Sequence, residues 1–415
     1  MTLDPALPTG ALLVASPRPA PLPVVVCGSR EPVCVHHERD LDPALGLAYV
    51  RALEDARAQL VHALGVPAPL PDVGLGPTPG LDLYLDDRAG LDVRVQPDPA
   101  VALDDRRSGF CQARASRAEL QRQAVSCVGE LVLLGVDAAE TPFFRRAIAS
   151  YLWTLVGAPG QRDRDALDAL QANPQLGVAG REAQPWSAGA ALFFDYADAR
   201  LGVGTPGLLP VALVQIARRD TPVERSLRWH NEPDLIDVLR SAFASSRQRF
   251  DDFMLDFAVE RAFVGARDGA GRHPALGWYG SAGRVRFDWV LTASSLPRRV
   301  APRRPLEPFG SAYSWLELDR VTLGKALAVR AEWEEPTLFR WSLVSVDASG
   351  KPIKRFDLPL VRGATSAERS IVDYDGAAGI LIVAINLGGV DAAHPFDPDF
   401  EPFEPHGFTI YVTEL

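Results

Sequence analysis

The hydrophobic pattern of this 415-residue chain changes its period near residue 295. Between about residues 40 and 270, apolar residues recur at the three- and four-residue spacing of amphipathic or buried helices. Beyond residue 306, seven short runs alternate apolar and polar residues, as strands with one buried face do. They are AYSWLELD, LAVRAEWE, FRWSLVSVD, KRFDLPLV, ERSIVDYD, GILIVAINL and GFTIYVTEL. The pattern predicts an α+β fold, in which an α-rich domain with a small early sheet is followed by an antiparallel β-sandwich.

A chain of this length is too long to fold around a single hydrophobic core, so more than one domain is expected. Composition places the boundaries. We predict a Pro/Ala-rich segment over 1–30, the α-rich domain over 31–295, a Pro/Arg connector over 296–305 and the sandwich over 306–415.

The overall charge excludes one class of partner. The net charge is −10 and the pI about 5.3, whereas a nucleic-acid-binding protein needs a basic face to neutralise phosphates. We therefore expect no nucleic-acid partner. No window approaches the ~18–20 continuous apolar residues of a membrane-spanning helix, so no transmembrane segment is expected either.

Four cysteines lie in the first third of the chain: Cys27, Cys34, Cys111 and Cys127. Their spacing matches no C-x-x-C zinc or redox motif, and their even number favours two disulfides of open connectivity, with four buried thiols as the alternative. The N-terminal sequence lacks the basic start and apolar core of a signal peptide, and its Pro/Ala/Thr/Ser texture resembles a stalk left after cleavage. A cytoplasmic protein would also fit this texture. The cysteines favour an extracytoplasmic location (periplasmic, surface-bound or secreted), with any leader already removed.

One apolar helical run, predicted over 117–135, contains the segment Gly129-Glu130-Leu131-Val132-Leu133. In a zinc-protease helix, H-E-x-x-H places two imidazoles on one face to bind the metal, and the glutamate polarises the bound water. Glu130 stands at the glutamate position. Gly129 and Leu133 occupy the ligand positions, and neither can donate a lone pair to zinc. Glu130 is therefore predicted to be a vestigial catalytic residue at most.

The order of elements around this helix carries a family resemblance. A strand with VHH, a helix ending ALGVPAP, the strand LDLYLDD, the Glu130 helix and a helix capped by Thr141–Pro142 follow one another. This order, over residues 31–265, resembles exported bacterial zincin-like metalloproteases of the gluzincin type, and closely resembles uncharacterised myxobacterial exported proteins with a degenerate domain of that kind.

The resemblance implies a third metal ligand on the capped helix, where this chain has Arg145 and Arg146. Arg146 thus stands with Gly129 and Leu133 as a degenerate ligand position, and no zinc is expected. The alternative for Glu130 is a purely structural role, in which the buried carboxylate pairs with Arg145 or Arg146.

Other residue patterns give weaker indications. His36 and His37 are adjacent on a strand and point to opposite faces, His62 lies on the polar side of its helix, and His230 and His273 occupy loop-like sequence. The segment 388–406 is rich in aspartate, glutamate and proline. Its candidate calcium ligands are Asp391, Asp397 and Asp399. Calcium accepts such hard oxygen ligands, but the EF-hand spacing is missing, so a solvated acidic loop is the alternative.

These observations favour a catalytically inactive, metalloprotease-like binding or scaffold protein, exported, with a protein or cell-surface partner. An active hydrolase assembled from distant loops is one alternative. A glycan-binding sandwich is another, in which Trp315, Trp333 and Trp341 would stack on sugars if exposed, although indoles at such strand positions are more often part of the core.

Overall fold

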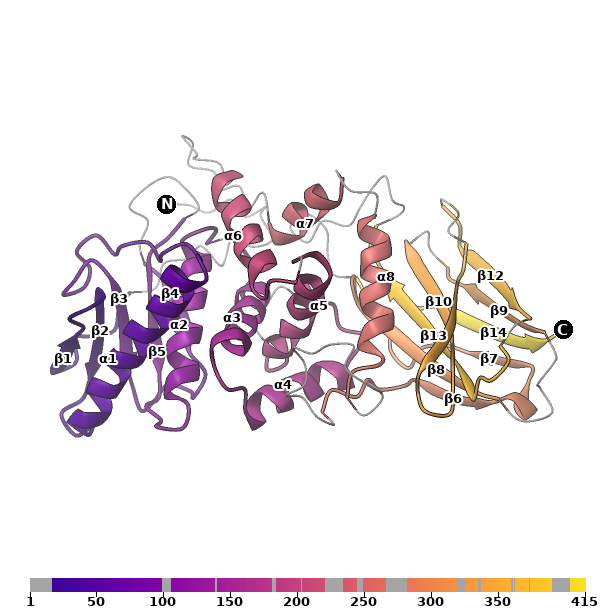
Figure 1. Cartoon of the computed structure of the whole chain (residues 1–415), viewed down its shortest axis with the longest axis horizontal. Coiled ribbons are helices and arrows are strands. Elements are labelled where there is room, and N and C mark those ends of the chain that lie inside the picture. Colours follow the sequence, from indigo (N-terminus) through magenta and orange to yellow (C-terminus); the bar gives the residue numbers. More distant parts are fainter. Residues whose placement is uncertain are drawn as a thin grey trace. The chain divides into compact units, whose positions relative to one another are not determined.

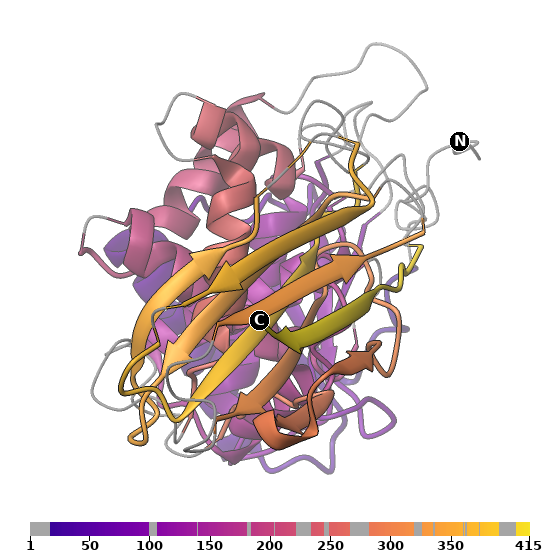
Figure 2. The same cartoon turned by 90° about the vertical axis from the view of Figure 1, so that its right-hand side faces the viewer.

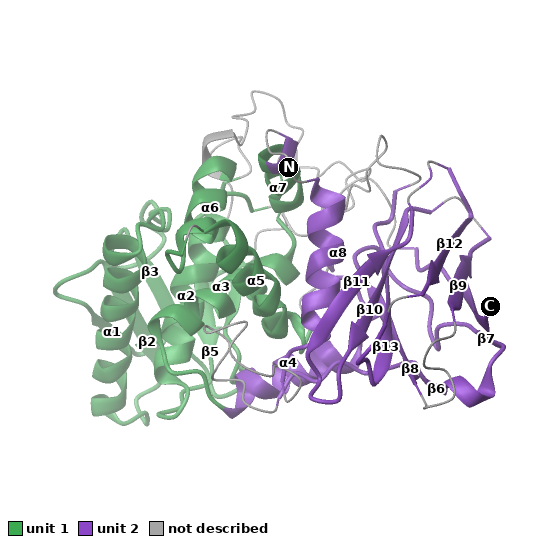
Figure 3. Ribbon diagram, turned by 45° about the vertical axis from the view of Figure 1, so that its right-hand side comes forward, with its two compact units in different colours: residues 1–160, 181–242 green, residues 161–180, 243–415 purple. Residues whose placement is uncertain are grey.

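The computed structural model divides the chain into two compact units built from alternating segments (Figure 3). Unit 1 comprises residues 1–160 and 181–242, and unit 2 comprises residues 161–180 and 243–415. The structure describes residues 17–98, 106–138, 140–180, 184–202, 204–220, 234–244, 249–265, 282–318, 326–334, 337–359, 361, 363–372, 374–389 and 404–415. The predicted α+β class is confirmed.

Unit 1 contains a five-stranded mixed sheet with the order β1-β2-β3-β5-β4 (Figure 1). Its strands are β1 (Val24–Cys27), β2 (Val33–His37), β3 (Leu81–Leu85), β4 (Arg94–Pro97) and β5 (Gly109–Ala113). The three central strands β2, β3 and β5 run parallel, and β1 and β4 flank them antiparallel. β2 and β3 are buried along their whole length, as central strands of a parallel sheet usually are, even though β2 ends in His36 and His37 and β3 contains Asp82.

Helix α1 (Pro43–Arg57) forms the crossover between β2 and β3 and begins at a well-formed cap. The Asp42 side chain accepts a hydrogen bond from the amide of Ala44, and Pro43 stands at the first helical position, where its missing N–H costs nothing. The helix continues as a π-helical segment, Ala58–Ala63. It lies beside α2 (Leu120–Leu134), and both helices contact the sheet.

Helix α3 (Pro142–Val156) begins where its sequence predicts. Thr141 Oγ1 accepts a hydrogen bond from the amide of Phe144, and Pro142 follows the cap. The helix packs closely on α2 because Gly129 has no side chain. A Cβ added there would lie 3.2 Å from Cβ of Ala149.

Two disulfides join all four cysteines. Cys27–Cys34 links facing positions of the β1–β2 pair, and Cys111–Cys127 ties β5 to α2. The sequence suggests that Cys111 and Cys127 flank a helical run, whereas Cys111 lies on a strand and Cys127 inside the helix. Disulfides of this kind persist in oxidising compartments, so they indicate an extracytoplasmic environment.

Between residues 187 and 244 the structure describes η3 (Ser187–Ala190), α5 (Ala191–Leu201), α6 (Leu208–Asp220) and α7 (Leu235–Ala244). A buried carboxylate organises three helices of unit 1. Asp198 on α5 accepts hydrogen bonds from Tyr151 Oη of α3 at 2.6 Å and from the amides of Gly207 and Leu209 at 2.6 and 2.8 Å. Asp198 therefore accepts hydrogen bonds from amides at the start of α6 that have no carbonyl partner within the helix.

Unit 2 is a β-sandwich of two sheets (Figure 2), with a helix against one of them (Figure 3). One sheet has the order β11-β10-β13-β8-β6 and the other β12-β9-β14-β7. The seven alternating runs become β8 (Ser311–Glu317), β9 (Leu327–Glu332), β10 (Phe339–Val346), β11 (Pro352–Asp357), β12 (Ser366–Ile371), β13 (Gly379–Asn386) and β14 (Thr409–Glu414). Residues of both sheets form one apolar core, as the pattern predicts.

Helix α8 (Phe250–Arg261) covers the outer face of the first sheet. Arg340 on β10 donates to Asp252 at 2.7 Å, and Tyr313 Oη on β8 donates to the carbonyl of Ala258 at 2.8 Å. This cover explains why β10 and β13 are buried at every position instead of alternating.

Three further elements of unit 2 lie before residue 306. They are α4 (Gln161–Ala172), β6 (Trp289–Thr292) and β7 (Arg298–Val300), with a short 3₁₀ turn at Ala293–Ser295. β7 pairs with β14, so part of the predicted 296–305 connector is an edge strand of the sandwich. In the part of the chain that the structure describes, no helix is long and apolar enough to cross a membrane.

Candidate functional site

Glu130 lies at the α2–α3 interface and pairs with Arg146. The family resemblance would place the third metal ligand at this arginine. Its Oε1 accepts a hydrogen bond from Arg146 Nε at 2.8 Å, and Arg146 Nη2 donates to the carbonyl of Val93 at 2.8 Å. The side chains of Glu130 and Arg146 are 7% and 19% exposed. The predicted structural pairing of Glu130 is therefore present, with Arg146 and not Arg145 as its hydrogen-bond partner.

The other two residues that the resemblance places at metal-ligand positions make only hydrocarbon contacts. Gly129 faces Ala149 of α3, and Leu133 is 3% exposed in the core of unit 1. A larger side chain at position 129, such as an imidazole, would crowd α3, because even an added Cβ would lie 3.2 Å from Cβ and 3.3 Å from Cα of Ala149.

Arg145 is hydrogen-bonded to the backbone that precedes α3. Its Nη1 donates to the carbonyls of Ala138 and Glu140 at 3.1 and 2.8 Å. Glu140 in turn accepts from the amides of Thr141 at 2.7 Å and Leu235 at 3.0 Å. Burial, together with the nearby Asp137, raises the pKa of Glu140 to about 7.

The described histidines His36, His37 and His62 bond to partners other than Glu130. His36 Nε2 bonds Asp82 Oδ1 at 2.7 Å, His37 Nδ1 bonds the carbonyl of Glu38 at 2.7 Å, and His62 is exposed and bonds Glu31. His230 and His273 lie outside the described residues. Within the described ranges, no three His, Cys, Asp or Glu side chains are arranged to hold a metal ion.

The predicted calcium ligands Asp391, Asp397 and Asp399 also lie outside the described residues, so calcium binding stays a prediction. The indoles of the glycan hypothesis do not share one open face. Trp333 and Trp341 belong to the sandwich core, and Trp315 is half-buried and stacks on Phe287 with ring centroids 6.4 Å apart.

A cavity of about 530 Å³ opens in unit 1 at the carboxyl edge of the parallel strands. Open sheets with parallel strands commonly bind ligands at this edge, because the loops that follow the strands converge there. Four acidic residues and one arginine line the cavity. They are Glu38 and Asp40, which follow β2, and Asp86, Asp87 and Arg88, which follow β3.

The segment that precedes β1 also lines this cavity, through Pro19, Ala20 and Leu22. The sequence LDLYLDD ends in two aspartates, and HHERD after β2 contains Glu38 and Asp40. Only the parallel pairing of β2 and β3, which the sequence does not reveal, brings both acidic ends to one edge of the sheet. The acidic residues after each strand were the available signal.

Comparison with known proteins assigns no family. No protein-family model and no curated protein matches the chain. Two solved structures are similar to 31% of it, each with a TM-score of 0.21. One is the pre-peptidase C-terminal domain of a collagenase from Bacillus anthracis, with 5% identity over 97% of its length. The other is CorA, a surface-associated copper-binding protein from Methylomicrobium album BG8, with 9% identity over 98% of its length.

Proposed function

We propose that the chain is a catalytically inactive, extracytoplasmic binding protein that keeps a metalloprotease-like helix pair without its metal site. The observation that carries this proposal is the Glu130–Arg146 pair. A general base must be free to take a proton from a metal-bound water. Here the Glu130 carboxylate accepts a hydrogen bond from the Arg146 guanidinium at 2.8 Å. Gly129 and Leu133, at the two ligand positions of the motif, offer no metal-binding atom.

Metal analysis and peptidase assays of the full chain test the loss of catalysis. We expect no stoichiometric zinc after purification and no peptidase activity above that of a Glu130→Gln variant. Stoichiometric zinc, together with activity that Glu130→Gln abolishes, would make the protein a working hydrolase and overturn the proposal.

For the binding activity, the carboxyl-edge cavity is the best-supported surface. Its volume is that of a ligand site, and four carboxylates against one guanidinium favour a cationic occupant. We infer that it receives a basic side chain from an exposed segment of a partner protein. The two disulfides support a periplasmic, surface-bound or secreted setting for such a partner.

Peptide binding measured by fluorescence anisotropy tests this surface. We expect lysine- and arginine-containing peptides to bind more tightly than charge-reversed peptides, and binding to weaken as salt increases. An Asp86→Asn/Asp87→Asn variant should lose several-fold in affinity and show a weaker dependence on salt. Glu368→Gln/Asp375→Asn removes two exposed carboxylates elsewhere, in unit 2, and serves as the matched control. Equal losses in both variants would indicate only a general charge effect and exclude the cavity.

A further inference from the structure

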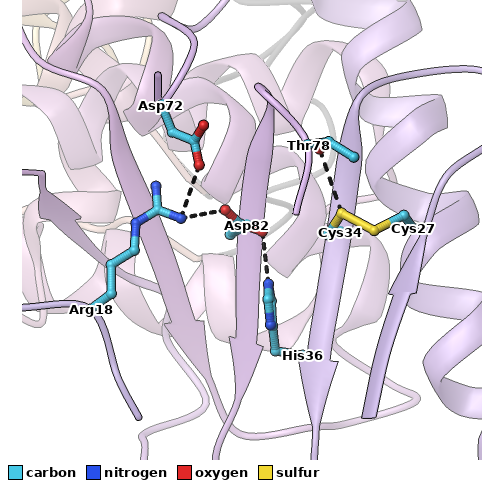
Figure 4. The surroundings of a disulfide bond; sticks show 7 residues. All are labelled: Arg18, Cys27, Cys34, His36, Asp72, Thr78 and Asp82. Atoms are coloured by element: carbon cyan, nitrogen blue, oxygen red, sulfur yellow. Dashed lines mark hydrogen bonds and ion pairs between the residues drawn. A yellow bond between two sulfur atoms is a disulfide. The ribbon is translucent and has the colours of Figure 1, made fainter. Parts of the chain in front are cut away.

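The segment before β1 inserts an arginine into a buried pocket of unit 1. Residues 17–22 have no regular secondary structure, yet the Arg18 side chain is only 10% exposed. Arg18 Nε and Nη2 donate to Oδ1 and Oδ2 of Asp98, both at 2.8 Å. Its Nη1 lies 3.1 Å from Asp72 Oδ2 and also donates to Asp82. Figure 4 shows this end of the guanidinium between Asp72 and Asp82.

The carboxylates are oriented by the fold and not by Arg18 alone. Asp82 on β3 is bonded by His36 of β2 at 2.7 Å, as Figure 4 shows, and His36 stacks on Tyr84 with ring centroids 4.2 Å apart. Asp98 follows β4 and accepts from Ser108 Oγ at 3.0 Å. Asp72 Oδ1 accepts from the amide of Gly74 at 3.2 Å. The pocket is therefore built mainly by the sheet and its loops.

Gly76 permits the convergence of two of these carboxylates. A Cβ added at position 76 would lie 2.1 Å from Asp82 Oδ2 and 2.6 Å from Asp72 Oδ2. No other residue would leave room for both oxygens at this point. Asp72, Asp82 and Asp98 are all 0% exposed, so water cannot replace a missing cation freely.

The pocket has the chemistry of a guanidinium receptor. Three carboxylates face one cation, so loss of that cation would leave buried negative charges without compensation. The bidentate contact with Asp98 matches a planar fork of N–H donors, which an ammonium group lacks. The ring of Phe110 lies 5.7 Å from Arg18 Cζ and adds an aromatic face that also suits a guanidinium.

We propose that Asp72, Asp82 and Asp98 form a specific guanidinium-binding site, which holds the N-terminal arm (residues 17–22) in place as a ligand in cis. Pro19, Ala20 and Leu22 of this arm line the carboxyl-edge cavity, so the site also fixes one wall of that cavity. The selectivity of the pocket for an alkylguanidinium over an alkylammonium does not depend on what the cavity binds.

Chemical rescue of the full-length Arg18→Ala variant tests the site. We expect its thermal midpoint to fall on the order of 10 °C, because buried carboxylates lose their partner. Millimolar ethylguanidinium should raise that midpoint in a saturable way, and ethylammonium at the same ionic strength should not. The unsubstituted chain, whose pocket Arg18 already fills, should show no such rise. Arg30→Ala is the matched control, because Arg30 also pairs with two carboxylates but its side chain is 58% exposed.

Equal rescue by ethylguanidinium and ethylammonium, or rescue of Arg30→Ala to the same extent, would overturn a specific guanidinium site. If Arg18→Ala does not fold, its refolding yield with each cation replaces the thermal midpoint. Recovery with ethylguanidinium alone supports the proposal, and recovery with neither or with both equally refutes it. Arg18→Lys keeps the charge without the fork and should remain less stable than the unsubstituted chain.

Discussion

Arg146 and Glu130 form an ion pair across the α2–α3 interface, with Nε and Oε1 2.8 Å apart and both side chains largely removed from water. The guanidinium also bonds the carbonyl of Val93. Arg146 is the hydrogen-bond partner of the buried Glu130 carboxylate, so replacing either residue alone leaves a buried polar group without that bond.

Substitution of Arg146 by methionine should therefore destabilise the protein strongly. We expect a loss of about 3 kcal/mol in the free energy of unfolding, measured by urea denaturation, because Glu130 remains without its partner. The double variant Glu130→Gln/Arg146→Met should recover much of this loss. As a control, Arg330→Met removes the partner of Glu332 at an exposed position and should cost less than about 1 kcal/mol. Similar losses in the two single variants would contradict the buried character of the Glu130 pair.

The two disulfides should differ in how quickly they are reduced. Cys27 is exposed on β1, whereas Cys111 and Cys127 are both 0% exposed. Since a thiolate must reach a sulfur atom to open the bond, mild reductant should open Cys27–Cys34 first. Mass spectrometry after timed reduction and alkylation measures this order directly. Alkylation of Cys111 and Cys127 before Cys27 and Cys34 in the folded protein would contradict the prediction.

The buried Glu140 should make stability depend on pH between about 4.5 and 7. Its pKa in the folded protein is raised from 4.5 to about 7, so the unfolded chain loses the proton first as pH rises. The neutral Glu140 carboxyl therefore makes its full contribution to the free energy of unfolding below pH 4.5, and this contribution is lost as the pH rises through 7. From the size of the shift, the loss amounts to roughly 3 kcal/mol.

Urea denaturation between pH 5 and pH 8 measures this contribution. In a Glu140→Gln variant, which cannot ionise at this position, the free energy of unfolding should fall less between pH 5 and pH 8 than in the unsubstituted protein. Glu54→Gln is the control, because hydrogen bonds from Arg30 and Glu31 hold the pKa of Glu54 below its usual value, so its contribution is lost only as pH falls below about 4.5. An unchanged pH dependence in Glu140→Gln would show that Glu140 is already ionised at pH 5.

Local patterns predicted the elements that depend on local chemistry. The seven strands from β8 to β14 follow from alternation of apolar residues, and α3 follows from the Thr141–Pro142 cap. The sequence patterns did not predict strands β1, β4, β5, β6 and β7 or helix α4. α4 buries only five of its twelve residues, and β4 has a single fully buried position, so their apolar signal is weak.

The candidate sites show the same division between local and non-local information. The Glu130–Arg146 pair joins residues of two consecutive helices, and its sequence neighbourhood allowed the pairing to be predicted. The guanidinium pocket brings Arg18, Asp72, Asp82 and Asp98 together from four separate segments. No local period connects these positions, and they meet only through the strand order of the sheet together with the segments that hold Arg18, Asp72 and Asp98 outside the strands.

The position of the indoles in the sandwich gives a last test, which separates a packing role from a glycan-binding role. Trp341 is 1% exposed and packs edge-on against Phe408 with ring centroids 4.5 Å apart. Trp341→Ala should therefore cost about 4 kcal/mol of unfolding free energy. Trp289 on the edge strand β6 is 38% exposed, so Trp289→Ala should cost clearly less.

Because the Trp341 ring is enclosed by the core, soluble oligosaccharides should leave its fluorescence unchanged. A saturable, saccharide-dependent change that disappears in a folded Trp341→Phe variant, and persists in Trp289→Ala, would mean that this indole reaches a ligand and that the sandwich binds glycans after all.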